Sequence, residues 1–85
     1  MWFVYVLKSL KNGFIYVGST NKLKRRFWEH NQGLNKSTKP LRPWKLVAYI
    51  AIPNEQTARS LEKYLKKGSG KAFLKKRILG DEALA

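Results

Sequence analysis

Three short runs of apolar residues alternate along the chain with polar stretches that contain glycine or proline. The first two runs, residues 2–8 and 14–20, are rich in β-branched and aromatic residues and lie on either side of Asn12-Gly13. Asn-Gly between two such runs predicts a hairpin, because both residues tolerate the positive φ that hairpin turns need. We therefore expect the runs to pair antiparallel. The first run is apolar on both faces, so we expect it to be central in a sheet or covered on two sides, and not an edge strand.

Helix signals follow this hairpin. Asn21 is suited to cap a helix over residues 22–32, and Gly33 is suited to end it in the left-handed conformation. Residues 34–43 have the composition of a basic loop stiffened by prolines. The third apolar run, residues 44–52, predicts another strand.

The C-terminal part predicts two more helices. Pro53-Asn54 ends the third strand and caps a helix over residues 55–67. Gly68-Ser69-Gly70 breaks that helix, and residues 71–79 form a shorter one. We expect the following residues to group on one side of the shorter helix: Phe73, Leu74, Arg77 and Ile78.

These elements make one small α+β domain over residues 1–80, with residues 81–85 as a frayed tail. The expected architecture is a three-stranded antiparallel β-sheet flanked by three helices, in the order β-β-α-β-α-α. At 85 residues the chain has no room for a second domain. The apolar amino terminus is short and runs straight into a turn, so we interpret it as a buried strand and expect a cytoplasmic protein.

The net charge of the chain indicates what kind of partner it binds. The chain has 18 Lys and Arg against 5 Asp and Glu, a formal net charge of +13, which points to an anionic partner. Nucleic acid is favoured over a membrane, because the basic residues are spread over the loops and every predicted helix. A ribosome-associated or merely very soluble basic protein stays open as an alternative. With no Cys, disulfides, thiolate metal sites and zinc fingers are excluded.

Tyr5 and Tyr16 lie on the two strands of the predicted hairpin. A two-residue loop at Asn12-Gly13 and a four-residue loop over residues 10–13 give two registers, and both place the tyrosines on the same face. We prefer the longer loop, because it sets Tyr5 opposite Gly18, where a ring can lie across a position with no side chain. The alternative is that both tyrosines are ordinary strand aromatics.

Ionisable residues lie where apolar ones are expected on the first helix. Arg26 and His30 extend the stripe of Leu23 and Phe27 at the i, i+3, i+4, i+7 spacing of a face that packs on a core. As i, i+4 neighbours, their side chains can reach one small volume. The alternatives are a hydrogen-bonded structural histidine and an arginine whose stem packs while its head stays in water.

Glu62 repeats this pattern on the next helix, where it shares a stripe with Ala58, Leu61 and Leu65. A carboxylate in that position must be paired, hydrogen-bonded or bound to a cation. The other acids lie off a core stripe, in a first helical turn or in the tail, so Glu62 is the candidate metal ligand. The alternative is a structural salt bridge to Arg26.

Several motifs together resemble the GIY-YIG nuclease domain. They are Phe3-Val4-Tyr5, then Tyr16-Val17-Gly18, then Arg26 and His30 on one helix and Glu62 on a later one. The chain is most similar to the stand-alone, single-domain bacterial members, and the resemblance covers residues 2–67. It departs from the family name at Phe3 and Val4, which replace Gly and Ile.

The resemblance implies a phosphodiester-cleaving enzyme that acts on DNA with one Mg²⁺ or Mn²⁺. It makes Tyr5, Tyr16, Arg26, His30 and Glu62 the candidate catalytic residues, with Glu62 as metal ligand and Gly18 as a structural residue of the site. Tyr5 is the candidate general base, helped by His30, although the two tyrosines can exchange roles. Arg26 would stabilise charge on the phosphate.

A separate set of basic residues is expected to grip phosphates with little sequence information: Lys36, Lys39, Arg42, Lys66, Lys67, Lys71, Lys75 and Lys76. Nothing resembles a recognition helix. Specificity is therefore expected for a nucleic-acid structure, such as a branched form or a single strand, or from a protein partner. Two alternatives stay open: a non-catalytic basic module of the same fold that binds DNA or RNA, and action on RNA in place of DNA.

Overall fold

Strand β1 (Trp2–Ser9) forms the centre of the fold in the computed structural model, which describes residues 1–80. Around it lie the other two strands and three helices: β2 (Ile15–Thr20), α1 (Leu23–Gln32), β3 (Trp44–Ile52), α2 (Glu55–Leu65) and α3 (Gly68–Phe73). A 3-10 turn, η1 (Lys39–Leu41), precedes β3, and a π-helical segment, η2 (Leu74–Leu79), continues α3. The predicted α+β class and element order are confirmed. The tail predicted at 81–85 lies outside the described residues.

The three strands are antiparallel in the order β2-β1-β3, so the strand that is apolar on both faces is central, as predicted. Tyr5 pairs with Gly18 and Leu7 pairs with Tyr16. This is the register of the four-residue hairpin loop, and the register of a two-residue loop is excluded.

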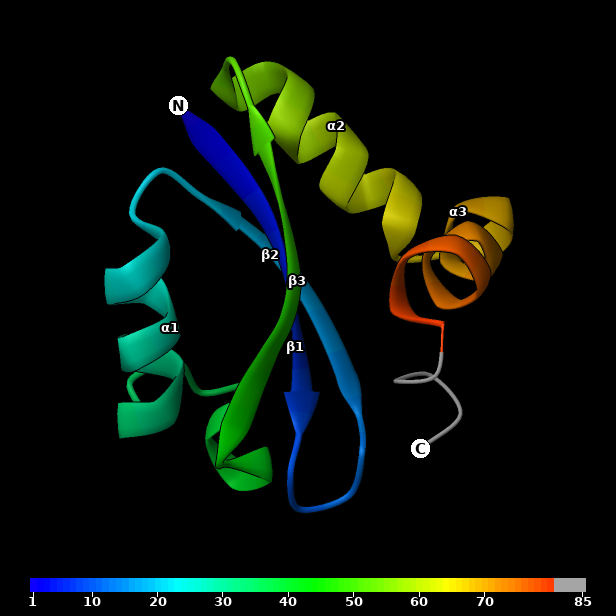
Figure 1. The fold of residues 1–85 in the computed structure, drawn as a ribbon. Helices are drawn as coiled ribbons and strands as arrows, with labels where there is room; N and C mark the ends of the chain where they lie inside the picture. Colours follow the sequence, from blue (N-terminus) through cyan, green and yellow to red (C-terminus); the bar gives the residue numbers. More distant parts are fainter. Residues whose placement is uncertain (81–85) are drawn as a thin grey trace.

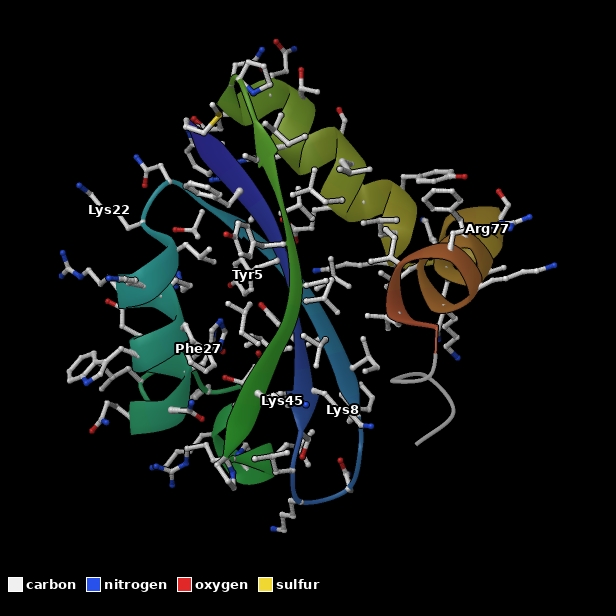
Figure 2. The ribbon with its side chains drawn as sticks, viewed as in Figure 1. Tyr5, Lys8, Lys22, Phe27, Lys45 and Arg77 are labelled. Atoms are coloured by element: carbon white, nitrogen blue, oxygen red, sulfur yellow. The ribbon has the colours of Figure 1, made fainter. Side chains whose placement is uncertain are left out.

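Helices cover both faces of the sheet. Figure 1 shows α1 on one side and α2 with α3 on the other. Residues of β1 alternate between the two layers: Val4 and Val6 belong to the core under α2 and α3, whereas Tyr5 and Leu7 belong to the core under α1. Phe27 of α1 packs on this second core, and Figure 2 shows Phe27 and Tyr5 in the layer between α1 and the sheet.

The helix caps confirm two predictions and correct one. Gly33 ends α1 with φ of 80°, and the Asn54 side chain accepts a hydrogen bond from the Thr57 N–H at 2.9 Å. Asn21, however, is not the cap of α1, which begins at Leu23. The turn is closed instead by Thr20, whose Oγ1 accepts from the Lys22 N–H at 3.0 Å.

The C-terminal helices differ from the prediction. The second helix ends at Leu65, and Gly68-Ser69-Gly70, expected to separate two helices, forms the first turn of α3. Gly70 is required there because a Cβ at this position would collide with the Tyr64 carbonyl. The π-helical turns of η2 also change the spacing of the buried face: Leu74 and Leu79 are buried, and the expected partners Phe73 and Arg77 are exposed. No helix within residues 1–80 is long and apolar enough to cross a membrane.

Candidate active site

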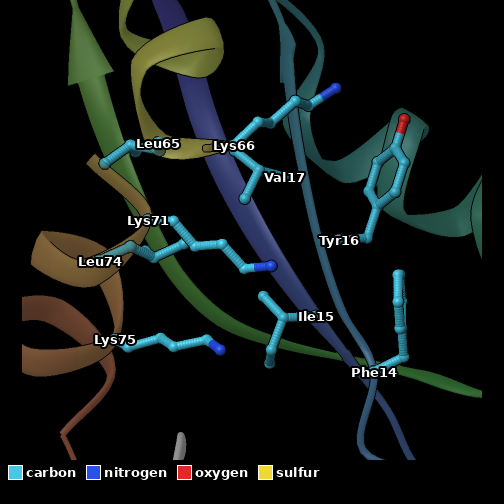
Figure 3. Close-up of a pocket in the computed structure, with 9 residues that line it drawn as sticks. All are labelled: Phe14, Ile15, Tyr16, Val17, Leu65, Lys66, Lys71, Leu74 and Lys75. Carbon is cyan, nitrogen blue, oxygen red and sulfur yellow. The ribbon is translucent and has the colours of Figure 1, made fainter. Parts of the chain in front are cut away.

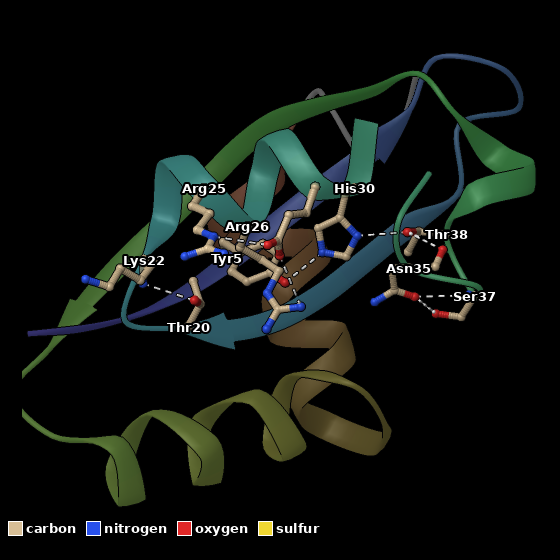
Figure 4. Close-up of polar contacts among 10 residues, drawn as sticks. Tyr5, Thr20, Lys22, Arg25, Arg26, His30, Asn35, Ser37 and Thr38 are labelled. Atoms are coloured by element: carbon tan, nitrogen blue, oxygen red, sulfur yellow. Dashed lines mark hydrogen bonds and ion pairs between the residues drawn. The ribbon is translucent and has the colours of Figure 1, made fainter. Parts of the chain in front are cut away.

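A buried chain of hydrogen bonds runs from β1 through α1 into the loop before η1. The Tyr5 Oη lies 2.9 Å from His30 Nε2, and His30 Nδ1 lies 2.8 Å from Thr38 Oγ1 (Figure 4). Tyr5 is 2% exposed, His30 0% and Thr38 1%. The imidazole is therefore shielded from water and held from both sides.

Donor and acceptor roles of an imidazole depend on its tautomer, which we assign here from the contacts of Thr38. Its hydroxyl donates to the Asn35 carbonyl at 3.4 Å, so its oxygen accepts from the Nδ1–H of His30. A neutral imidazole has one donor and one acceptor nitrogen, which leaves Nε2 as the acceptor for the Tyr5 hydroxyl. The resting proton of this pair is on Tyr5, and its path toward His30 is already formed.

Burial acts on both ionisable groups. It raises the pKa of Tyr5 well above the usual tyrosine range, and the neighbouring Tyr16 adds to the effect. Burial also lowers the pKa of His30 below its ordinary value, and the positive charge of Arg26 lowers it further. Both pKa shifts favour the neutral forms of Tyr5 and His30.

The lowered pKa of His30 predicts how stability depends on pH. As the pH falls below 6.5, the ordinary value for histidine, the unfolded chain takes up a proton that the folded chain resists. Protons therefore favour unfolding, and the free energy of unfolding is expected to fall from pH 7 to pH 5 more steeply than in the variant His30→Gln. Urea unfolding at each pH measures this, and equal slopes for the two proteins would contradict it.

Gly18 gives the Tyr5 ring its place. A Cβ at position 18 would lie 2.5 Å from Cζ of Tyr5 and 3.0 Å from its Cε1, so the ring lies directly over the glycine. The ring of Tyr16 is close to both other members, with its centroid 6.4 Å from Tyr5 and 5.1 Å from His30. The two tyrosines and the histidine form one cluster on the α1 side of the sheet.

Arg26 lies at the rim of this cluster. Its side chain is 43% exposed, and Nη1 is 3.7 Å from Glu29 Oε1. Figure 4 shows the guanidinium beside the hydroxyl end of Tyr5, where its charge opposes the rise in the pKa of that phenol. The position leaves much of the guanidinium open to a ligand.

Glu62 lies on α2, which covers the opposite face of the sheet from α1. One carboxylate oxygen accepts from the hydroxyl of Ser19, the neighbour of Gly18, and the other is 2.8 Å from Lys66 Nζ. The negative charge of Glu62 is close enough to contribute to the raised pKa of Tyr5. The salt bridge considered between Glu62 and Arg26 is not present, because the ion-pair partner of Glu62 is Lys66.

Glu62 is the candidate ligand for a hard cation, because carboxylate oxygens are the ligands that Mg²⁺ prefers. In the structure both of its oxygens are engaged, one by the Ser19 hydroxyl and one by the Lys66 ammonium. Within residues 1–80 no group of three or more His, Cys, Asp or Glu is placed to hold a metal ion. A cation would therefore depend on Glu62 and keep most of its waters, as Mg²⁺ does.

Sequence reasoning did not assign Ser19 and Thr38 to the site. Ser19 was detectable from the hairpin register, because alternation puts it on the opposite face from Gly18, toward the helix that carries Glu62. The i, i+4 spacing of Glu62 and Lys66 also predicts their ion pair. No local sequence pattern predicts the contact of Thr38 with His30, because the path of the loop after α1 brings the two residues together. Asn31, the neighbour of His30, bonds the backbone of Trp44 through both amide atoms: Oδ1 accepts from the Trp44 N–H at 2.6 Å, and Nδ2 donates to the Trp44 carbonyl at 3.1 Å.

The residues predicted to grip phosphates form two groups. Lys36, Lys39 and Arg42 lie in the loop between α1 and β3, where the Arg42 side chain is held by the Lys39 carbonyl at 3.0 Å. The other group lies at the end of α2 and along α3 and η2: Lys66, Lys67, Lys71, Lys75 and Lys76. Of these, Lys66 is the residue shared with the cluster around Tyr5.

Comparisons with known proteins identify the family and the fold. The family described as the GIY-YIG catalytic domain matches residues 1–77. A UPF0213 protein of Clostridium perfringens is 41% identical over 68 residues, which cover 79% of this chain and 72% of that protein. A UPF0213 protein of Cupriavidus pinatubonensis is 32% identical over 69 residues, 80% of this chain and 76% of that one.

A solved structure is similar as well. The solution NMR structure of a UPF0213 protein from Bacillus halodurans superposes with a TM-score of 0.58 at 31% identity, over 98% of this chain and 92% of the other. Its fold and the family match both extend across the elements that carry Tyr5, Tyr16, Arg26, His30 and Glu62. The chain is therefore a member of the GIY-YIG catalytic domain family.

Proposed function

We propose that this protein is a divalent-metal-dependent endonuclease that hydrolyses phosphodiester bonds in DNA with low sequence specificity or with specificity for a DNA structure. The observation that carries the proposal is the hydrogen-bonded pair of Tyr5 and His30, positioned over Gly18 and flanked by the charges of Arg26 and Glu62. The net charge of +13 supports an anionic polymer as substrate. Its family supports nuclease chemistry.

Water activation is the role proposed for Tyr5 and His30. A free phenolate at Tyr5 is disfavoured, because burial raises its pKa. The pair avoids that intermediate: Tyr5 accepts a proton from the attacking water while its own proton passes to His30 Nε2. The products are hydroxide and imidazolium, and the Thr38 oxygen keeps the ring oriented throughout. Tyr16, beside both residues, would orient the water or a phosphate oxygen.

Arg26 and Glu62 are proposed to neutralise negative charge on the phosphate. The guanidinium of Arg26 would pair with phosphoryl oxygens through its planar fork of donors. Glu62 would hold Mg²⁺ or Mn²⁺, which supplies neutralisation of the phosphoryl and leaving oxygens when bound. Ser19 fixes the carboxylate in place through its hydroxyl.

A nicking assay tests the proposal directly. Purified protein is incubated with supercoiled, linear and branched DNA in Mg²⁺, in Mn²⁺ or in EDTA. We expect cleavage that requires the metal and is lost in Glu62→Ala and in Arg26→Ala, while circular dichroism shows that both variants fold. Lys24→Ala, an exposed change elsewhere on α1, is the matched control and should retain activity. Cleavage that survives both site substitutions, or none on any substrate, would reject the proposal.

The second candidate is a basic module that binds DNA or RNA without turnover. It is favoured by one observation: both carboxylate oxygens of Glu62 are already engaged, by Ser19 and Lys66. Binding that depends on salt but is unchanged by Glu62→Ala and by metal, in the absence of any cleavage, would support it. Nothing in the sequence resembles a recognition helix, so for either candidate we propose that specificity beyond nucleic-acid structure comes from a protein partner.

A further inference from the structure

A groove opens from the site along the outer side of β2. It has a volume of about 260 Å³ and lies between the hairpin end of β2 and the helices on the second face of the sheet. Its lining residues are Phe14, Ile15, Tyr16, Val17, Leu65, Lys66, Lys71, Leu74 and Lys75 (Figure 3). Tyr16 and Lys66 belong to both the groove and the site, with Lys66 Nζ 5.6 Å from the centroid of the Tyr16 ring, so the groove adjoins the proposed reaction centre.

The groove continues past Phe14. A second hollow of about 260 Å³, lined by Gly13, Phe14, Ile15, Lys71 and Lys75, shares all but its glycine with the first. Phe14 lines both hollows and is 56% exposed. A large apolar ring is thus presented to solvent along the path that leads away from Tyr16.

Charge along this path is positive. Figure 3 shows the Lys71 and Lys75 side chains extending from α3 and η2 toward Ile15 across the groove. Neither lysine forms an ion pair with another residue of the described part of the chain, and the lining residues described there include no acid. An aromatic ring with ammonium groups opposite it matches a nucleotide, whose base stacks on the ring while its phosphate pairs with the charges.

We propose that this groove binds a single strand of DNA, with an unpaired base stacked on Phe14 and adjacent phosphates bound by Lys71 and Lys75. A base inside a duplex is already stacked and paired, so its face cannot meet Phe14 without being unpaired first. The strand would then continue past Lys66 and Tyr16 to the site. The inference rests on the proposed action on DNA and names the substrate as an unpaired segment, at a branch or a free end.

Binding without turnover tests the groove separately from the nuclease. Fluorescence anisotropy in EDTA compares a labelled dT20 strand, a 20-base-pair duplex and an rU20 strand. In Phe14→Ala we expect affinity for dT20 to fall about tenfold, with little change for the duplex. The matched control is Trp28→Ala, since Trp28 is an aromatic residue that is also 56% exposed but lies on α1. Phe14→Tyr should retain the affinity and Phe14→Leu should lose it, because stacking needs the ring.

The contribution of Lys71 and Lys75 is measured by the salt dependence of binding. The double variant Lys71→Ala/Lys75→Ala should reduce the slope of log affinity for dT20 against log salt by about 1.4, at roughly 0.7 per phosphate contact. The control Lys24→Ala/Lys63→Ala removes the same charge from other exposed positions and should leave the slope unchanged. An unchanged affinity in Phe14→Ala, an equal loss for the duplex, or tighter binding of rU20 than dT20 would overturn the inference. Because EDTA prevents metal-dependent cleavage, none of these results depends on whether the protein is a nuclease.

Discussion

Replacement of Gly18 by alanine is expected to destabilise the domain by about 3 kcal/mol, at the upper end of the cost of overpacking. The new methyl group would lie 2.5 Å from Cζ of Tyr5, a contact that requires the ring to move. The ring has no room to do so, because Tyr5 is buried, hydrogen-bonded to His30 and covered by Tyr16. Urea unfolding measures the loss, and cleavage should fall with it, since the displaced ring carries the hydroxyl proposed to activate water.

The sign of this effect is informative. Gly18 does not have positive φ, so an ordinary strand glycine in its place would gain about 0.4–1 kcal/mol on replacement by alanine, through loss of freedom in the unfolded chain. A stabilised Gly18→Ala protein would therefore show that Tyr5 does not lie over this position. In a Tyr5→Leu background, where the ring is absent, most of the penalty of Gly18→Ala should disappear. A penalty that stays the same would assign it to the backbone and not to the ring.

Local signals accounted for most of the fold. The Asn12-Gly13 turn and the alternation of side chains were enough to pair β1 with β2, and opposing a tyrosine to a glycine selected the correct register. They failed where packing decides between local options. Gly68 and Gly70 predict a non-helical break between two helices, yet they form the start of α3, where Gly70 lies close to the Tyr64 carbonyl.

The candidate site divides in the same way. His30 was found because a polar residue on an apolar helical stripe is unusual, and the hairpin register placed the two tyrosines together. Thr38 was not predicted because it meets His30 only through the path of the loop after α1, and Ser19 was not predicted because its partner Glu62 lies 43 residues further along the chain. Periodicity identifies which face a residue lies on, whereas the partner it meets there is set by how loops and helices close over the sheet.

Removal of a single oxygen atom gives the largest effect expected on catalysis. In Tyr5→Phe the ring stays over Gly18, but the hydroxyl that links water to His30 is lost. We expect the rate of metal-dependent cleavage to fall about 10²–10⁴-fold, the usual contribution of a positioned general base. Stability should fall by about 1–3 kcal/mol, because His30 Nε2 remains buried without its donor. Single-turnover cleavage on saturating DNA measures the rate, and DNA affinity should stay within about twofold, since the removed group acts on water and not on the strand.

Tyr49→Phe is the matched control for that experiment. Tyr49 pairs with Tyr5 across β1 and β3, but its ring is exposed, so the same atom is removed from the same sheet outside the site. The control should cleave at the rate of the unaltered protein.

The pH profile separates the proton relay from a purely structural role of the Tyr5 hydroxyl. Cleavage by the unaltered protein should fall as pH drops and His30 takes up a proton. Because the pKa of His30 is lowered, that fall should lie below pH 6.5. In Tyr5→Phe the residual rate should not show this acid limb, because water is no longer connected to the imidazole. A Tyr5→Phe protein that cleaves at the normal rate, or one that keeps the full acid limb, would remove Tyr5 from the proton path and leave it as a buried aromatic of the core.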